Sequence, residues 1–410
     1  MTQSPTPSST EPKQNHFSLS LFLPLLASIV AITPLAIDTY LPAMTMIAAD
    51  LGTEMSLMQL TLSLFLAGYA AGLLFFGPMA DIFGRRPLVL FGLSGFMLTS
   101  VLLAFTESVG WFLALRLLQA FTGSAATVTV SGYVKLIYGK NLSKGMSYVS
   151  MIMMLAPMIA PTIGVLLLEL HGWPLIFLTL AAYALLILVL SILALPKVER
   201  HPLNDSLFNT FFKSYSIVLS NLAVRRYIIL ICFSTLTFFG YLTAISFIYM
   251  QVYQLSETLF GILFALTVVI FLLSSFLNTR MVGIFGSLRM AKGAWFGTAI
   301  GVMVLLMVNL QGMHVYWTAA SLAVLLGCVL VVSTNADALI LLQFSEQTGT
   351  ATGVIGTLRF GFGALAGPIL ALFYDGSAMP FCYLMLFSVV AVGVCLFVPS
   401  GSGSTSALES

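Results

Sequence analysis

Charged side chains are scarce in this chain: Asp, Glu, Lys and Arg together make up 7% of its 410 residues. A soluble globular domain carries roughly 25% of such residues, because they cover its surface. Hydrophobic residues make up 59% of the sequence. A water-soluble fold cannot leave its surface this poor in charge, so the composition excludes one and indicates an integral membrane protein.

Residues that carry catalytic or metal chemistry are scarce as well. The four cysteines lie in apolar runs, without the spacing of a disulfide framework or a metal site. The four histidines are scattered, and no P-loop sequence for binding ATP is present. A net charge of +2 is too small to indicate a nucleic-acid partner. We therefore expect no metal, no cofactor and no enzymatic activity, and the lack of a visible pore loop disfavours a channel.

Long apolar runs account for most of the chain. A helix across a bilayer needs about 20 apolar residues, whereas barrel strands are about ten residues long. The sequence thus predicts an all-α membrane protein with twelve transmembrane helices. Residues 1–17 lack the pattern of a cleavable signal peptide and, like residues 399–410, are predicted to be a flexible cytosolic tail. The predicted spans are 18–43, 56–80, 87–106, 109–134, 145–169, 173–195, 227–250, 258–279, 291–309, 314–342, 350–374 and 379–398.

Basic residues fall on one side of this predicted topology. Of the sixteen basic residues, Arg116 and Arg359 lie within spans, while the outer loops contain acidic residues and no Lys or Arg. Because cytoplasmic loops are enriched in Lys and Arg, we predict a multi-pass protein of the inner membrane with both termini in the cytoplasm. The fourteen basic residues on the inner side are Lys13, Arg85, Arg86, Lys135, Lys140, Lys144, Lys197, Arg200, Lys213, Arg225, Arg226, Arg280, Arg289 and Lys292.

The two halves of the chain resemble each other at an offset of about 200 residues, as in transporters built from repeats. Phe83–Arg86 follows the second predicted span, and Phe285–Arg289 follows the eighth. Ala160–Pro161 and Gly367–Pro368 lie in the fifth and eleventh spans. We therefore predict two pseudo-symmetric bundles of six helices, residues 18–195 and 227–398, joined by a cytosolic linker at 196–226.

Four stretches carry a family resemblance. Gly77–Pro87 resembles the loop signature of the major facilitator superfamily. Ile37–Ala43, Leu115–Gly123 and Ala156–Gly164 resemble motifs of its twelve-span drug:proton antiporters, and the combination is most similar to the bicyclomycin/chloramphenicol-resistance (Bcr/CflA-type) branch. The resemblance implies the major facilitator fold and, through the fifth-span motif, export. Arg359 stands where a glutamine is commoner in that branch.

Asp38 and Arg116 are the first candidate site. A charged side chain inside a span is costly and faces a cavity or a partner. Counting from the outer ends of their spans places these two residues at similar depth. Arg116 keeps its charge and would stabilise ionised Asp38. We interpret the two as the proton-coupling site, as the resemblance also implies for Arg116; the alternative is a static ion pair.

Asp337 and Arg359 are the second candidate pair. Counted from the turn between the tenth and eleventh spans, both lie roughly 15–18 Å deep, since a helix rises 1.5 Å per residue. The counting predicts an ion pair across this hairpin. The alternative is a cationic cavity wall formed by a free Arg359.

Two sets of residues are candidates for conformational roles. Gly77, Asp81, Gly84, Arg85 and Arg86 form a loop that the resemblance places against residues 349–352, as a latch favouring the outward-facing state; the alternative is that the arginines only fix the topology. In the fifth span, prolines interrupt helical hydrogen bonds and glycine permits close approach of a neighbour, which indicates a hinge, although ordinary helix packing is the alternative. The hinge residues are Pro157, Pro161 and Gly164.

Polar, aromatic and methionine side chains within the spans are candidates for the substrate cavity, because such residues suit adaptable binding of bulky apolar molecules. The predicted cavity residues are Tyr40, Gln59, Ser63, Gln119, Tyr133, Met153, Phe239, Tyr241, Asn335, Asp337 and Arg359.

These observations and the resemblance together predict a proton-coupled multidrug efflux antiporter that works by alternating access. Its partners would be a small drug-like molecule, protons and the lipid bilayer, and the chain would act as a monomer. The alternative is a proton-coupled uptake symporter for a metabolite, because the same fold serves both directions.

Overall fold

A computed structural model describes residues 19–138, 159–196, 222–341 and 348–397, together with the single residues 156, 216 and 220. The predicted tails, most of the predicted linker, and the residues Met153 and Pro157 lie outside this part of the chain. Where the chain is described, all regular elements are helices, as predicted.

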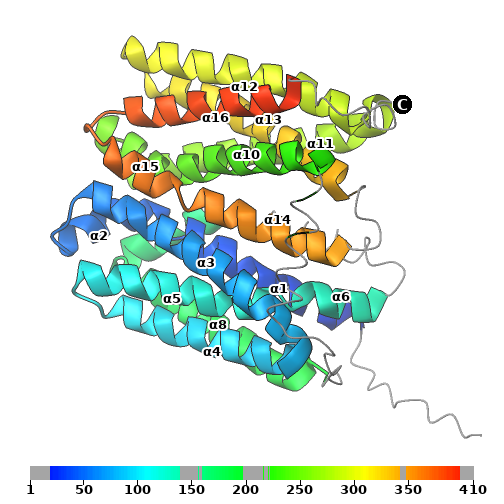
Figure 1. The fold of residues 1–410 in the computed structure, drawn as a ribbon. Helices are drawn as coiled ribbons and strands as arrows, with labels where there is room; N and C mark the ends of the chain where they lie inside the picture. Colours follow the sequence, from blue (N-terminus) through cyan, green and yellow to red (C-terminus); the bar gives the residue numbers. More distant parts are fainter. Residues whose placement is uncertain are drawn as a thin grey trace, which may run out of the picture.

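Figure 1 shows the helices of the first half, up to residue 194, on one side of the molecule and those of the second half on the other. The first half contains α1 (Leu19–Asp38), the 3-10 turn η1 (Leu41–Ala43), α2 (Met44–Asp50), α3 (Met55–Phe83), α4 (Arg85–Ala104), α5 (Val109–Thr127), α6 (Val130–Tyr138), the helix Ile159–His171 and α8 (Pro174–Ala194). The second half contains α10 (Leu222–Phe247), the π-turn η3 (Ile248–Val252), α11 (Glu257–Phe285), α12 (Ser287–Leu310), α13 (Val315–Leu341), α14 (Thr348–Gly363), α15 (Ala366–Leu372) and α16 (Met379–Phe397).

Eleven helical segments of the described residues are long and apolar enough to cross a membrane, and Ile159–His171 is a shorter apolar helix at the predicted fifth span. The sides of α4, α8, α11, α12 and α16 expose large apolar side chains. A soluble protein rarely exposes such extensive apolar surface, so these sides suit contact with lipid. Examples are Phe91, Leu193, Ile284, Met307 and Phe387.

Three spans predicted as continuous helices are interrupted. α1 ends at Asp38, and α14 ends at Gly363. Proline explains both breaks, because it lacks the N–H that a helix bonds to the carbonyl group four residues earlier. Pro42 leaves the Asp38 carbonyl without that partner, and Pro368 does the same for Ala364. The span predicted at 109–134 divides between α5 and α6, where the Thr129 hydroxyl donates to the Ala126 carbonyl oxygen at 2.8 Å.

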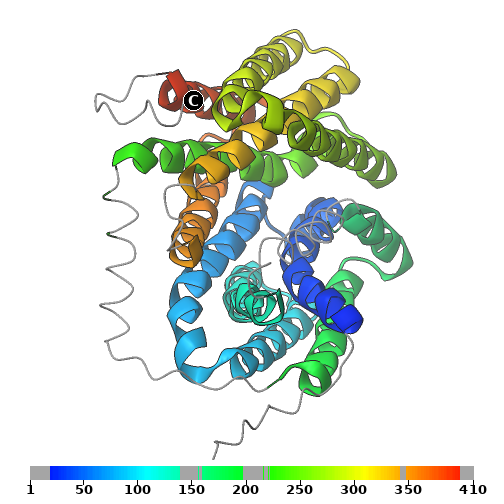
Figure 2. The same ribbon diagram turned by 90° about the vertical axis from the view of Figure 1, so that its right-hand side faces the viewer.

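The two halves meet along α3, which packs against α14 and α15 (Figures 1 and 2). The rings of Tyr69 and Phe360 meet edge to face with 4.6 Å between centroids. The backbone N–H of Gly367 donates to Ser63 Oγ at 2.8 Å. A Cβ at position 367 would collide with this hydroxyl, so a glycine there lets the two helices approach closely. A second link joins Ser246 of α10 to the carbonyl oxygen of Leu41 at 2.8 Å.

Candidate functional site

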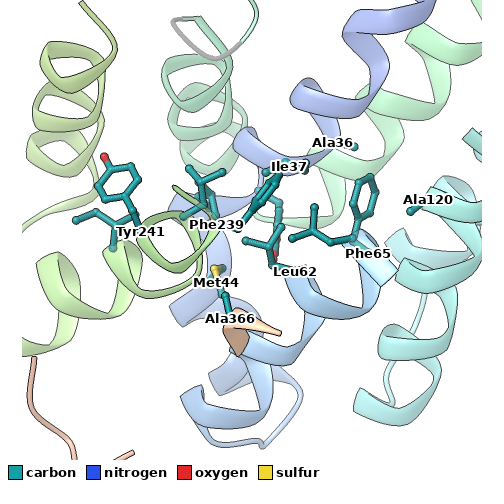
Figure 3. Packing of buried hydrophobic residues seen from close by; sticks show 14 of the residues in the cluster. Ala36, Ile37, Met44, Leu62, Phe65, Ala120, Phe239, Tyr241 and Ala366 are labelled. Atoms are coloured by element: carbon teal, nitrogen blue, oxygen red, sulfur yellow. The ribbon is translucent and has the colours of Figure 1, made fainter. Parts of the chain in front are cut away.

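A cavity of about 360 Å³ lies where α1 of the first half faces α10, α11, α13 and α14 of the second half. Most of its wall is apolar, and several of the side chains are aromatic. Figure 3 shows Ile37 and Phe239 meeting in this region, with Tyr241 on the same helix as Phe239. The lining residues are Thr33, Pro34, Ile37, Asp38, Ser234, Thr235, Phe238, Phe239, Tyr241, Leu242, Phe264, Thr267, Val268, Phe271, Leu326, Val329, Leu330, Ser333, Arg359 and Phe360.

Asp38 brings a carboxyl group to this cavity from the last residue of α1. The side chain is 3% exposed, and its Oδ1 atom has no hydrogen-bond partner among the described residues. Because Pro42 ends the helix here, the site combines a helix break with a buried acid. An ionisable residue at membrane depth that lines a cavity is a candidate functional group by default, since holding it there is costly.

Arg116 lies on α5, fully buried, in an aromatic cage. Its guanidinium carbon is 4.2 Å from the ring centroid of Tyr40 and 4.5 Å from that of Phe65. The Nη1 atom donates to the Ala36 carbonyl oxygen at 3.2 Å and to Gln119 Oε1 at 2.8 Å. Cation–π contacts of a desolvated guanidinium contribute about 2 kcal/mol. Arg116 therefore attaches the last turn of α1 to α5.

The proposed static ion pair between Asp38 and Arg116 is not formed. Among the described residues, the salt bridge with an N–O distance of 4.0 Å or less is the one between Arg359 and Asp337, and it involves neither Asp38 nor Arg116. The guanidinium binds the carbonyl of Ala36, two residues before the acid, and aromatic faces hold its charge. A role of Arg116 in proton coupling remains a prediction and would act through the backbone of α1 or through space.

The predicted ion pair between Asp337 and Arg359 is confirmed. Arg359 Nη2 lies 2.7 Å from Asp337 Oδ1 and 2.6 Å from Oδ2, which joins α14 to α13. Their side chains are 31% and 29% exposed. Arg359 also lines the cavity. The alternative of a free Arg359 is therefore not realised, although the paired guanidinium still forms part of the wall.

Comparison with known proteins decides the family to which this arrangement belongs. The sequence profile of the Major Facilitator Superfamily matches residues 26–368. The chain belongs to this superfamily. Superfamily membership makes it a multi-pass membrane transporter rather than an enzyme.

Two relatives and one solved structure refine this result. The chain is 32% identical over 378 residues to the bicyclomycin resistance protein homolog of Haemophilus influenzae, covering 91% of this chain and 94% of the relative. It is 38% identical over 164 residues to the chloramphenicol resistance protein of Pseudomonas aeruginosa, 40% of this chain and 39% of the relative. The resemblance to the Bcr/CflA-type branch of the superfamily is therefore confirmed. The E. coli xylose transporter XylE, in a partially occluded inward-open conformation, superposes with a TM-score of 0.69 at 15% identity, over 93% of this chain and 100% of that one, and so shows the superfamily fold.

Several residues predicted to line the cavity of this superfamily member instead bind one another within the helix packing. Tyr40 lies under Arg116 and shares a hydrogen bond with the Thr61 hydroxyl at 2.7 Å. Gln119 donates to Ser100 at 2.7 Å and accepts from Arg116. The prediction was wrong for these two because buried polar groups in a span satisfy each other before they face a cavity.

The same correction applies to other predicted cavity residues. Asn335 donates to Asn278 Oδ1 at 2.7 Å, Ser63 accepts from Gly367, and Tyr133 packs edge to face on Phe22. Gln59 is buried, and neither it nor Asp337 lines the cavity. Phe239, Tyr241 and Arg359 do line it, and their contact with a substrate remains a prediction.

The aromatic residues of α11 were missed. Phe264, Thr267 and Phe271 face the cavity together. They recur at intervals of three and four residues, which places them on one face of a helix. This spacing was visible in the sequence, although lipid-facing phenylalanines on the same helix, such as Phe276, mask it.

The superfamily loop between α3 and α4 is anchored within the first half. Gly84 forms the turn with φ of +85°, a conformation that favours glycine. Arg85 donates to the Gly132 carbonyl oxygen at 3.0 Å, and Arg86 donates to that of Ile192 at 2.6 Å. The arginines thus bind α6 and α8. Gly77 has open space around it, and the side chain of Asp81 lies outside the described atoms, so a latch to α14 remains a prediction.

The fifth-span helix packs tightly against the break after α1. A Cβ at Gly164 would collide with the backbone carbonyl of Thr39 and would lie 3.0 Å from Pro42 Cγ. The predicted close approach at Gly164 is therefore confirmed, while a hinge motion is a separate prediction. Pro161 is buried in the same helix.

Arg116→Lys is expected to destabilise the protein by about 1–3 kcal/mol, because an ammonium cannot keep the planar stacking and both hydrogen bonds at once. Thermal unfolding in detergent would measure the change. Arg280→Lys, at an exposed arginine of α11, is the matched control. Equal unfolding temperatures for the two variants would contradict the attachment of α1 through Arg116.

Proposed function

We propose that the protein is a proton-coupled drug efflux antiporter of the bacterial inner membrane. The observation that carries the proposal is Asp38: a buried carboxyl group without a salt-bridge partner among the described residues, at the wall of an aromatic cavity between the two halves. The names of the bicyclomycin- and chloramphenicol-resistance relatives support drugs as cargo.

The proposal includes the architecture that such exchange needs. Twelve transmembrane helices would form two six-helix bundles, with Ile159–His171 as the outer part of the fifth span. Both termini would lie in the cytoplasm because the basic residues gather on that side. The chain would act as a monomer without a cofactor.

Exchange follows from the position of the acid. When the cavity opens outward, Asp38 takes up a proton, and the neutral group is easier to hold in the membrane. When the cavity opens inward, the drug binds along the apolar wall as the proton leaves to the cytoplasm. The bundles then tilt back around the loaded cavity. Each proton that crosses a potential of 100 mV supplies about 2.3 kcal/mol.

Proteoliposomes with an acidic lumen would test the direction of coupling. Antiport predicts that chloramphenicol accumulates in the lumen as protons leave, whichever way the protein is inserted, and that a protonophore abolishes the accumulation. Protein-free vesicles are the control. Depletion of the drug from the acidic lumen would indicate symport instead. Equal accumulation with and without the proton gradient would contradict proton coupling.

A further inference from the structure

Two side chains with formal charge line the cavity, Asp38 from α1 and Arg359 from α14. The rest of the wall is apolar, aromatic or hydroxyl-bearing. Binding sites of this kind take their orientation and specificity from the few polar groups in an apolar wall. These two groups therefore indicate which chemical class of substrate the cavity can bind.

Arg359 is held by Asp337 in a way that leaves donors unused. Both carboxylate oxygens contact the same nitrogen, Nη2, at 2.7 and 2.6 Å. A fork-to-fork pair would engage two nitrogens instead. The guanidinium also carries N–H groups on Nε and Nη1. Nε is buried and has no hydrogen-bond partner among the described residues.

A molecule in the cavity cannot reach the buried Nε, but Nη1 makes no hydrogen bond to the described residues, and the side chain of Arg359 is 31% exposed. An acceptor oxygen of a bound molecule can take a hydrogen bond from Nη1, and hydrogen bonds to a charged group contribute about 1.5–3 kcal/mol. Because Asp337 already holds the guanidinium through Nη2, little side-chain freedom would be lost on binding. The ion pair is thus a donor site fixed in advance at the cavity wall.

The charges around the site favour a neutral acceptor. Asp337 balances the positive charge of Arg359, so the pair carries no net charge that would attract an anion. A carboxylate substrate would lose its hydration in a medium of low dielectric constant without such an attraction, whereas an uncharged nitro oxygen needs only a hydrogen-bond donor.

The surrounding wall suits an aromatic ring. Phe360 follows Arg359 directly, and its ring lies 5.8 Å from that of Phe239. On the α11 side, Phe238 stacks with Phe271 at 5.7 Å between centroids. These rings already pack against one another, and a substrate ring at the cavity wall can meet them edge to face.

We propose that Arg359 determines substrate specificity by donating hydrogen bonds to the nitro oxygens of an uncharged aromatic substrate, while Asp337 holds the guanidinium in place. This inference rests on the proposed function and adds to it the chemical class of the cargo.

Binding of two matched compounds to the purified protein in detergent tests the assignment. Chloramphenicol carries an aryl nitro group, and its reduced derivative carries an aryl amine in the same place. We expect the wild type to bind the nitro compound about tenfold more tightly, since hydrogen bonds to a charged group contribute about 1.5–3 kcal/mol. Arg359→Met, which has no N–H donor in its side chain, should remove this preference and leave the affinity for the amine within about twofold. Arg280→Met, at an exposed arginine of α11, should keep the preference.

The double variant Asp337→Asn with Arg359→Met tests whether misfolding explains the loss, because it leaves no charge without its partner. It should show the same loss of preference for the nitro compound, and in size-exclusion chromatography it should elute like the wild type. A wild type that binds neither compound or binds both equally, or Arg359→Met and the double variant keeping the nitro preference, would overturn the assignment. Binding with the expected preference but without proton-driven transport would overturn the proposed function and leave the specificity site standing.

Discussion

Asp38→Asn is expected to abolish proton-driven drug accumulation in proteoliposomes while drug binding persists. The amide has nearly the shape of the carboxyl group but binds no proton in the working range of pH. With no proton taken up and released at the cavity wall, the potential can no longer drive the exchange. We expect accumulation to fall from the wild-type level to that of protein-free vesicles.

Two further measurements separate coupling from folding for this variant. Chloramphenicol affinity in detergent should lose its dependence on pH, and exchange of labelled for unlabelled drug without a proton gradient should continue. Glu107→Gln, at an exposed acid between α4 and α5, is the matched control and should transport normally. Undiminished proton-driven accumulation in Asp38→Asn would remove this acid from the mechanism.

The sequence predicted the depth of intramembrane charges better than their partners. Asp337 and Arg359 were paired correctly because the fixed rise of two helices joined by a short turn relates their positions directly. An ion pair of Arg116 with Asp38, the alternative that the sequence left open, is not formed, because Arg116 binds the carbonyl of Ala36 and the faces of Tyr40 and Phe65. A sequence does not show which backbone carbonyl or aromatic ring an arginine will contact, because such groups are present throughout the helices.

The helices were predictable from apolar length, and their interruptions less so. Pro42 and Pro368 lie near the ends of predicted spans, where a proline is easily read as a boundary. In the structure each proline breaks the helix four residues earlier, at Asp38 and Ala364. This rule alone does not locate the break at Asp38, because Pro24 and Pro34 lie inside α1 without ending it.

The cavity was the least predictable part. Polar residues in spans were expected to face it, but Gln119 binds Ser100 and Asn335 binds Asn278. Which polar groups satisfy each other depends on how the helices are arranged around one another, and the period of a single helix does not contain that information. The aromatic face of α11 carried a usable signal, because its spacing is local to one helix.

Gly164→Val is expected to lower transport more than tenfold and to destabilise the protein by about 1–3 kcal/mol, the usual cost of overpacking. A Cβ at this position collides with the backbone carbonyl of Thr39, and backbone cannot turn aside as a flexible side chain does. The fifth-span helix must therefore move away from the break between α1 and η1, and Asp38 lies one residue before Thr39. Transport in proteoliposomes and thermal unfolding in detergent measure the two effects, and Gly164→Ala should give smaller losses of the same kind.

Gly283→Val is the matched control, because Gly283 is also helical and a Cβ there would meet no atom within 4 Å. The intrinsic helix propensity changes in the same way in both variants, so any difference between them reports the collision. Equal stability and transport would mean that the helices tolerate separation at this seam. A loss confined to Gly164→Val would instead show that proton exchange at Asp38 requires the fifth span to remain in contact with the first.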